Sequence, residues 1–153
     1  MKILMVCLGN ICRSPLAEGL MQAKLQSLTN DYFVDSAGTG GWHAGESPDK
    51  RSIIVAAKYG IDITHQKARK LQKEDLSRFD FIFAMDHSNY SDIVHLASPE
   101  QQKNVHLFLD FAGMGKKDVP DPWYGGPEDF EQVFALLDEA CTRVVHKILN
   151  VNP

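Results

Sequence analysis

The chain has 153 residues, of which 44% are hydrophobic and 24% charged, a composition typical of one globular domain with a hydrophobic core. Its net charge of -4 lacks the positive surplus of nucleic-acid binders, and no stretch approaches the roughly 20 apolar residues that span a bilayer. The three cysteines are too few for a disulfide-stabilised fold or a four-ligand zinc site. We therefore expect residues 1–153 to form a single cytoplasmic domain, with neither nucleic acid nor membrane as a partner.

Apolar runs and helix signals alternate along the chain. Residues 3–6 form an apolar run of strand length, and Ser14-Pro15 begins a helix with Ser14 as its N-cap. Further strands are expected at 32–35, 79–85 and 105–109, and further helices at 47–59, at 88–96 and from Pro127 onward. The glycine-rich segment 36–41 is expected to be irregular. The alternation predicts a three-layer α/β fold, with helices on both faces of a four-stranded parallel sheet.

The loop after the first strand carries the most informative residues, Cys7-Leu8-Gly9-Asn10-Ile11-Cys12-Arg13-Ser14-Pro15. Parallel sheets bind ligands beyond the carboxyl ends of their strands, where this loop lies. Amides at a helix N-terminus attract an anion, Arg13 can hold two phosphate oxygens, and the same field biases Cys7 toward the thiolate. The loop therefore predicts a phosphate-binding site with an attacking sulfur. The alternative is a buried structural cysteine beside a surface arginine.

Two later features complete a candidate site. Phosphate-ester cleavage needs a proton for the departing oxygen. Asp121, which lies between two prolines that restrict its backbone, is the better candidate donor, and Asp118 is the alternative. Trp42, Trp123 and Tyr124 lie in glycine-containing loops, where aromatic side chains commonly line a binding cleft, although a single one often covers the core.

The loop of residues 7–15 resembles the signature loop of the low-molecular-weight protein tyrosine phosphatases. Four further segments resemble blocks of that family in the expected order: Asp35-Ser36-Ala37-Gly38, Gly60 to Arg69, Ala84-Met85-Asp86 with Asn89, and Asp121-Pro122-Trp123-Tyr124-Gly125. The resemblance covers nearly the whole chain. It implies a phosphatase that hydrolyses phosphotyrosine through a phosphocysteine intermediate.

The resemblance also implies residue roles. Cys7 would attack phosphorus, Arg13 and the amides of residues 8–13 would hold the oxygens, and Asp121 would serve as general acid and then general base. Trp42, with Trp123 or Tyr124, would flank the phenyl ring. Ser14 would assist the sulfur of Cys7 as a leaving group. The loop would be supported by a further set, Asn10, Ser36, His65 and Asp86.

Cofactors and partners follow from the same resemblance. No metal or cofactor is expected, because Arg13 and the loop amides take the place of a cation. Tyrosine-phosphorylated proteins would be substrates, inorganic phosphate and other oxyanions would be product or inhibitors, and the chain would be a monomer or weak dimer. Cys12 would form a reversible disulfide with Cys7 or be a packed thiol, and Cys141 would be a core residue.

Three alternatives to a phosphotyrosine phosphatase are considered. Protein arginine phosphatases carry Thr in place of Ile11, whose bulk favours phosphotyrosine. Arsenate reductases need resolving cysteines in a later segment, where this chain has only Cys141. Phosphocysteine carriers of sugar-transport systems pass phosphate on without hydrolysis, and Arg13 with Asp121 argues against that class. Finally, residues 110–153 hold eight acidic and four basic side chains, so we expect basic residues beside a substrate's phosphotyrosine to be tolerated or preferred.

Overall fold

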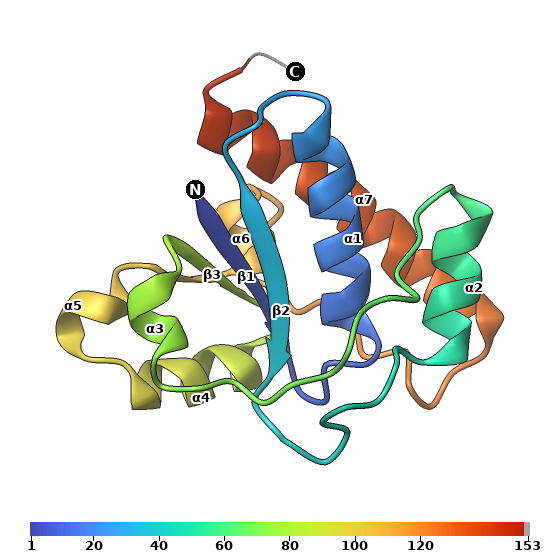
Figure 1. Ribbon diagram of the computed structural model, residues 1–153, viewed down its shortest axis with the longest axis horizontal. Coiled ribbons are helices and arrows are strands. Elements are labelled where there is room, and N and C mark those ends of the chain that lie inside the picture. The colour runs from blue at the N-terminus through green and yellow to red at the C-terminus, as the bar shows by residue number, and fades with distance from the viewer. Residues whose placement is uncertain (152–153) are drawn as a thin grey trace.

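The computed structural model describes residues 1–151, in which four strands form one parallel sheet in the order β2-β1-β3-β4 (Figure 1). The strands are β1 (Lys2–Cys7), β2 (Phe33–Gly38), β3 (Phe81–Ala84) and β4 (Val105–Leu107). β1 pairs with both β2 and β3, so it lies inside the sheet and Cys7 ends a central strand. The last two residues of the predicted domain, 152 and 153, lie outside the described residues.

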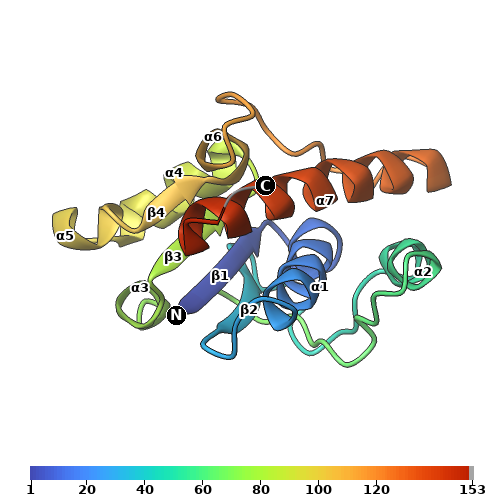
Figure 2. The same cartoon turned by 90° about the horizontal axis from the view of Figure 1, so that it is seen from above.

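Helices cover both faces of the sheet. The longer helices are α1 (Arg13–Gln26), α2 (Lys50–Lys58), α4 (His87–Leu96) and α7 (Pro127–Leu149), and the short ones are α3 (Asp75–Arg78), α5 (Pro99–Gln102) and α6 (Phe108–Phe111). Ile3 and Met5 of β1 join the core formed with α1 and α7, which lie side by side (Figure 2). Leu4 and Val6 face the opposite core, which contains residues of α3 and α4. The three-layer prediction is confirmed because alternate residues of β1 are buried on opposite faces.

Predicted strand boundaries differ from the structure in three strands, and the third, expected at 79–85, is the shorter β3, Phe81–Ala84. β2 runs to Gly38 although segment 36–41 was expected to be irregular, because Ala37 and Gly38 continue the parallel pairing with Val6 and Cys7. The predicted fourth strand ends at Leu107, where the chain turns into α6. Strand pairing thus overrides the local preference of glycine at the end of β2.

Two predicted helix starts also differ. α1 begins at Arg13 with Cys12 in the N-cap position, so Ser14 is not the cap, and its hydroxyl bonds to other side chains. α2 begins at Lys50, where the side chain of Asp49 accepts a hydrogen bond from the amide of Arg51. An aspartate cap replaces the predicted start at Ser47-Pro48.

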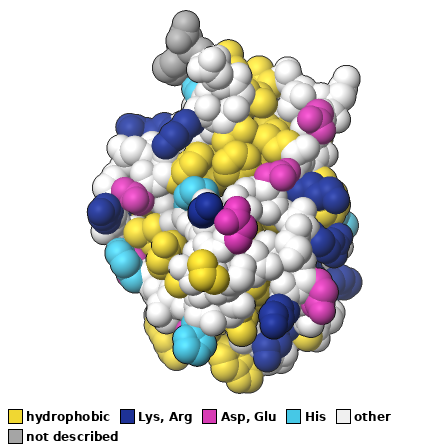
Figure 3. Space-filling view, turned by 90° about the vertical axis from the view of Figure 1, so that its left-hand side faces the viewer, with side chains coloured by type: hydrophobic (Ala, Val, Ile, Leu, Met, Phe, Trp, Pro, Cys, Tyr) yellow, Lys and Arg dark blue, Asp and Glu magenta, His cyan; other side chains and the backbone are white. Residues whose placement is uncertain are grey.

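Among the helices of residues 1–151, none is long and apolar enough to cross a membrane. One side of the molecule bears a patch of hydrophobic side chains bordered by lysine, arginine and acidic side chains (Figure 3). The carboxyl ends of the strands lie elsewhere, at the lower edge of the sheet in Figure 1. The loop after β1 emerges at that edge.

Candidate active site

The segment that joins β1 to α1, residues 7–13 and here called the phosphate loop, turns at Asn10. The φ of Asn10 is 59°, in the left-handed region that asparagine tolerates better than most residues. The side-chain Nδ2 of Asn10 donates to Ser14 Oγ (2.8 Å) and to Ser36 Oγ (3.0 Å). Its Oδ1 accepts from the backbone amide of Arg69 (3.0 Å). Three hydrogen bonds from separate parts of the chain therefore hold this turn.

Cys7 lies at the start of the phosphate loop with its Sγ 3.0 Å from Ser14 Oγ. Because Ser14 Oγ already accepts a hydrogen bond from Asn10, its own proton is free to be donated to the sulfur. This contact is the one that the resemblance implied for Ser14.

Arg13 is 3% exposed and connects the phosphate loop to two other segments. Its Nη1 donates to Asp86 Oδ2 (2.7 Å) and to the carbonyl oxygen of Val119 (3.0 Å). Its Nη2 lies 3.7 Å from Asp121 Oδ2. Asp86 orients the guanidinium, and Arg13 thereby reaches the segment that contains the candidate acid.

The buried setting affects the ionisation of two loop side chains differently. Burial opposes the charge of Arg13, but Cys7 and Asp86 outweigh it and raise the pKa of Arg13 above its ordinary value. Burial, with Asp49 and Cys7 nearby, raises the pKa of Cys12 to about 12. Arg13 therefore stays cationic, while Cys12 keeps its proton at neutral pH. Both cysteines of the loop are free thiols.

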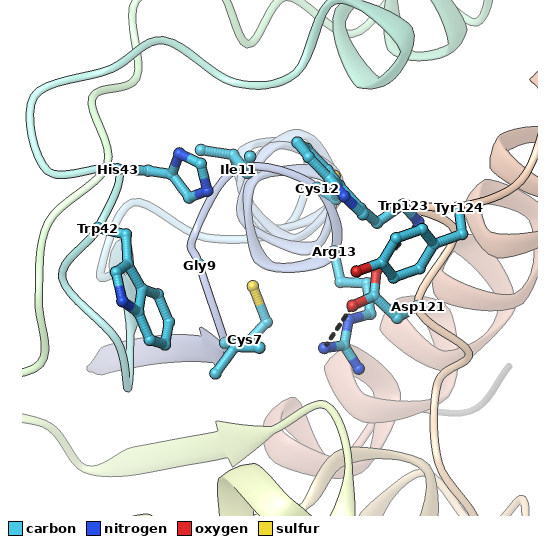
Figure 4. A pocket seen from close by; sticks show the side chains of 11 residues that line it. Cys7, Gly9, Ile11, Cys12, Arg13, Trp42, His43, Asp121, Trp123 and Tyr124 are labelled. Carbon is cyan, nitrogen blue, oxygen red and sulfur yellow. Dashed lines mark hydrogen bonds and ion pairs between the residues drawn. The ribbon is translucent and has the colours of Figure 1, made fainter.

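A pocket of about 250 Å³ opens above the phosphate loop (Figure 4). The sulfur of Cys7 points into it, Trp42 and His43 form one side, and Trp123 and Tyr124 form the other. The remaining lining residues are Leu8, Gly9, Ile11, Cys12, Arg13 and Asp121. The structure thus brings together the predicted nucleophile, arginine, acid and three aromatic residues from three separate segments.

The two candidate acids differ in position. Asp121 lines the pocket, and its Oδ1 accepts from the amide of Trp123 (3.1 Å). Asp118 does not line the pocket: its Oδ1 accepts from the backbone amide of His87 (2.9 Å) and also contacts the His87 ring. The hydrogen bond with the His87 side chain lowers the pKa of Asp118. The geometry therefore favours Asp121 over Asp118.

His65 is the one predicted supporting residue that the structure does not bring to the loop. Ile63 and Gln66 are buried and joined by a turn, with the amide of Gln66 donating to the Ile63 carbonyl (3.2 Å), and this turn leaves His65 exposed. The side chain of Gln66 instead reaches the start of α1, where its Nε2 donates to the carbonyl of Pro15 (3.0 Å). Gln66, and not His65, therefore bonds the first turn of α1.

Two residues of the site were missed by the sequence analysis. His43 lines the pocket, and its Nδ1 lies 2.9 Å from Glu46 Oε2. Glu18 is buried behind the phosphate loop, where its Oε1 accepts from Ser36 Oγ (2.6 Å) and burial raises its pKa to about 7. A signal for Glu18 existed, since it follows Ser14 by four residues and therefore lies on the same face of α1.

A parallel α/β fold that sets a thiol, a buried arginine and a carboxyl around one pocket beyond its strands is typical of proteins that bind phosphate esters. The chain belongs to the low molecular weight phosphotyrosine protein phosphatases, whose family description, "Low molecular weight phosphotyrosine protein phosphatase", matches residues 2–152. It is 44% identical over 144 residues to "Low molecular weight phosphotyrosine protein phosphatase 1" of Drosophila melanogaster, with 92% of each chain covered.

Solved structures of related proteins have the same fold. A protein tyrosine phosphatase from Entamoeba histolytica with Hepes in its active site superposes with a TM-score of 0.92 at 37% identity, over 98% of this chain and 97% of that one. A drosophila arginine phosphatase superposes with a TM-score of 0.89 at 31% identity, over 97% and 98% of the two chains. The predicted family is therefore confirmed, and its relatives include a protein named for another phosphoamino acid.

Proposed function

We propose that the chain hydrolyses phosphotyrosine in proteins through a phosphocysteine intermediate on Cys7. One observation carries the assignment of roles: Cys7, Arg13 and Asp121 line the same pocket although they come from the phosphate loop and from a segment about 110 residues later. In that pocket the sulfur, the oxygen-binding guanidinium and the proton donor surround one space.

In the first step, the thiolate of Cys7 attacks phosphorus while the bond from phosphorus to the phenolic oxygen breaks. Arg13 and the amides at the start of α1, which lack partners inside the helix, hold the three other phosphate oxygens. Asp121 gives its proton to the departing phenolate, so tyrosine leaves neutral and the phosphate stays on sulfur.

In the second step, the carboxylate of Asp121 takes a proton from water as the water oxygen attacks phosphorus. The bond from phosphorus to sulfur breaks, inorganic phosphate leaves, and the Cys7 thiolate is restored. The hydroxyl of Ser14, 3.0 Å from the sulfur, stabilises that thiolate as the leaving group. Atoms and charge balance without any further reactant.

The walls of the pocket support phosphotyrosine as the substrate. Trp42 and Trp123 stand on opposite sides of the space above Cys7, where a phenyl ring fits between aromatic surfaces (Figure 4). The side chain of phosphoserine is too short to place its phosphorus at the phosphate loop when the substrate backbone lies outside the pocket. Ile11 adds an apolar side chain to the lining of the pocket.

Variants of the proposed nucleophile and acid test this mechanism. Cys7→Ser is expected to abolish turnover of a phosphotyrosine peptide while vanadate, a phosphate analogue, still binds. Asp121→Ala is expected to slow phenyl phosphate hydrolysis by about 10² to 10⁴-fold, and hydrolysis of 2,4-dinitrophenyl phosphate much less, because that leaving group needs no proton. Retained turnover in Cys7→Ser, or equal losses for the two esters in Asp121→Ala, would contradict the assignment.

Phosphoarginine is the second candidate substrate, because the solved drosophila relative is named an arginine phosphatase. A side-by-side assay of phosphotyrosine and phosphoarginine peptides separates the two, and we expect phosphotyrosine to be preferred. Exchanging Ile11 for Thr is expected to weaken that preference.

We further infer the setting in which the chain works. Residues 1–153 act as one domain, as a monomer or weak dimer, on tyrosine-phosphorylated proteins of the cytoplasm. The three free thiols, Cys7, Cys12 and Cys141, support a reducing compartment.

A further inference from the structure

The side chain of Arg51, a residue of α2, lies between α7 and the segment of residues 118–126, here called the acid loop. Its Nε and Nη2 donate to the two carboxylate oxygens of Asp49, each at 3.0 Å. Its Nη1 donates to the carbonyl oxygens of Trp123 (3.0 Å) and Gly125 (3.1 Å). All three guanidinium nitrogens are therefore used, and two of the acceptors are backbone atoms of the acid loop.

The same guanidinium packs on aromatic rings. Its central carbon lies 4.5 Å from the ring centroid of Phe130, which is buried in α7, and 5.5 Å from that of Trp123. Stacking restricts the plane of the guanidinium, and the pair with Asp49 restricts its rotation. The positions of the Trp123 and Gly125 carbonyls are thus tied to a rigid group.

The other end of this connection lies on the phosphate loop. The backbone amide of Asp49 donates to the carbonyl of Ile11 (2.8 Å), and the hydroxyl of Ser52 donates to the carbonyl of Cys12 (3.4 Å). The start of α2 is therefore bonded to the loop that follows the nucleophile. Arg51 extends from there to the loop that carries the acid.

We propose that Arg51 is a positioning residue, which sets Asp121 and the wall residue Trp123 relative to the phosphate loop. The inference rests on the proposed role of Asp121 as general acid. Arg51 acts only through the acid loop: it does not line the pocket and does not touch the reacting atoms. Lysine cannot replace it, because one ammonium cannot hold a carboxylate by a planar fork and bond two carbonyls.

The test compares Arg51→Gln with Asp121→Ala and with the matched control Lys58→Gln. Lys58 also lies on α2, carries the same charge and bonds α7 through Glu131, but it does not reach the acid loop. Arg51→Gln is expected to slow phenyl phosphate hydrolysis about tenfold, and 2,4-dinitrophenyl phosphate hydrolysis much less. Vanadate inhibition should stay unchanged because the phosphate loop is intact. Lys58→Gln should resemble the wild type with both esters.

Combining Arg51→Gln with Asp121→Ala shows whether Arg51 acts through Asp121. In the Asp121→Ala background, Arg51→Gln should add almost nothing to the loss in kcat, because the acid that Arg51 positions is already missing. Arg51→Lys should restore little activity. Asp49→Asn keeps a cap for α2 but loses the charged fork, so it should give a weaker form of the same leaving-group dependence. This milder variant, and Arg51→Lys, give a readout even when Arg51→Gln folds poorly.

Specific outcomes would overturn the inference. Equal losses for the two esters in Arg51→Gln and Asp49→Asn, or full additivity with Asp121→Ala, would assign Arg51 a purely structural role. Failure of the proposed function looks different: Cys7→Ser would retain turnover, or Asp121→Ala itself would show no dependence on the leaving group.

Discussion

Cys7 and Glu18 are the two ends of a buried chain of four hydrogen bonds through Ser14, Asn10 and Ser36. The amide of Asn10 donates to both serine hydroxyls, which leaves each hydroxyl proton to point outward, one toward the sulfur and one toward the carboxyl. The direction of every bond is therefore set at Asn10. A single side chain thus orients the group beside the nucleophile and the group that satisfies a buried acid.

Glu18 makes stability depend on pH. Burial raises its pKa from 4.5 to about 7, so between these values the folded chain keeps a proton that the unfolded chain has lost. Stability from this group is therefore present at low pH and falls as pH rises toward 7, by at most about 3 kcal/mol. Glu18→Gln should remove this slope. Urea unfolding at several pH values between 4.5 and 8 measures it.

The control for Glu18 is Glu139→Gln, a change at an exposed glutamate of α7 that bonds Arg143. It should leave the pH slope of the wild type unchanged. An identical slope in the wild type and Glu18→Gln would mean that Glu18 ionises alike in the folded and unfolded chains.

At the level of elements, the end of β2 lies in direct backbone contact with the phosphate loop. The amide of Thr39 donates to the Cys7 carbonyl and that of Gly40 to the Leu8 carbonyl, both at 2.9 Å. A Cβ on Gly38 would lie 2.7 Å from the Leu8 carbonyl oxygen and 3.1 Å from the Gly9 carbonyl carbon. Glycine is needed at Gly38 for contact rather than for an unusual φ.

Gly38→Ala is therefore expected to push the phosphate loop away from β2. We expect a loss of about 1 to 3 kcal/mol of stability together with weaker vanadate binding, since the loop amides would move. Thermal unfolding and vanadate inhibition measure the two effects. Gly126→Ala is the control, because a Cβ there meets open space. Wild-type vanadate binding in Gly38→Ala would show that the loop tolerates the displacement.

How much of the site can be predicted from the sequence depends on how far apart along the chain the interacting residues lie. Cys7 and Arg13 could be predicted because nucleophile and phosphate-binding residue share one loop, and the sheet could be predicted because buried strands leave continuous apolar runs. Arg51 could not, because its partners at Trp123 and Gly125 lie more than 70 residues away. His65 shows the limit of a matched family block: the block suggests His65 as a supporting residue, whereas the local turn buries Gln66 and leaves His65 exposed.

For the molecule as a whole, charge is distributed unevenly around the pocket. The acidic surplus of residues 110–153 includes Asp121 and Asp129, which line a groove of about 390 Å³ that adjoins the pocket at Asp121. Phosphate binding is local, since it depends on Arg13 and the backbone amides of the phosphate loop. A net charge of -4 is therefore compatible with binding a dianion.

This distribution predicts a preference among phosphopeptides. Peptides with lysine beside phosphotyrosine should have a kcat/KM several times higher than matched peptides with glutamate, because the acidic groove attracts the former and repels the latter. The difference should shrink at 0.5 M NaCl, where charges on the surface are screened. Equal values for both peptides at low salt would contradict the prediction.

The chain contains two tryptophans, and both stand at the mouth of the pocket, Trp42 71% exposed and Trp123 39% exposed. Indole emission shifts when water around the ring is displaced. All of the intrinsic tryptophan fluorescence of this protein therefore originates from residues beside the pocket. Occupancy of the pocket can be followed optically in the unlabelled protein, and each emission signal can be assigned to one wall by replacing the other tryptophan with phenylalanine.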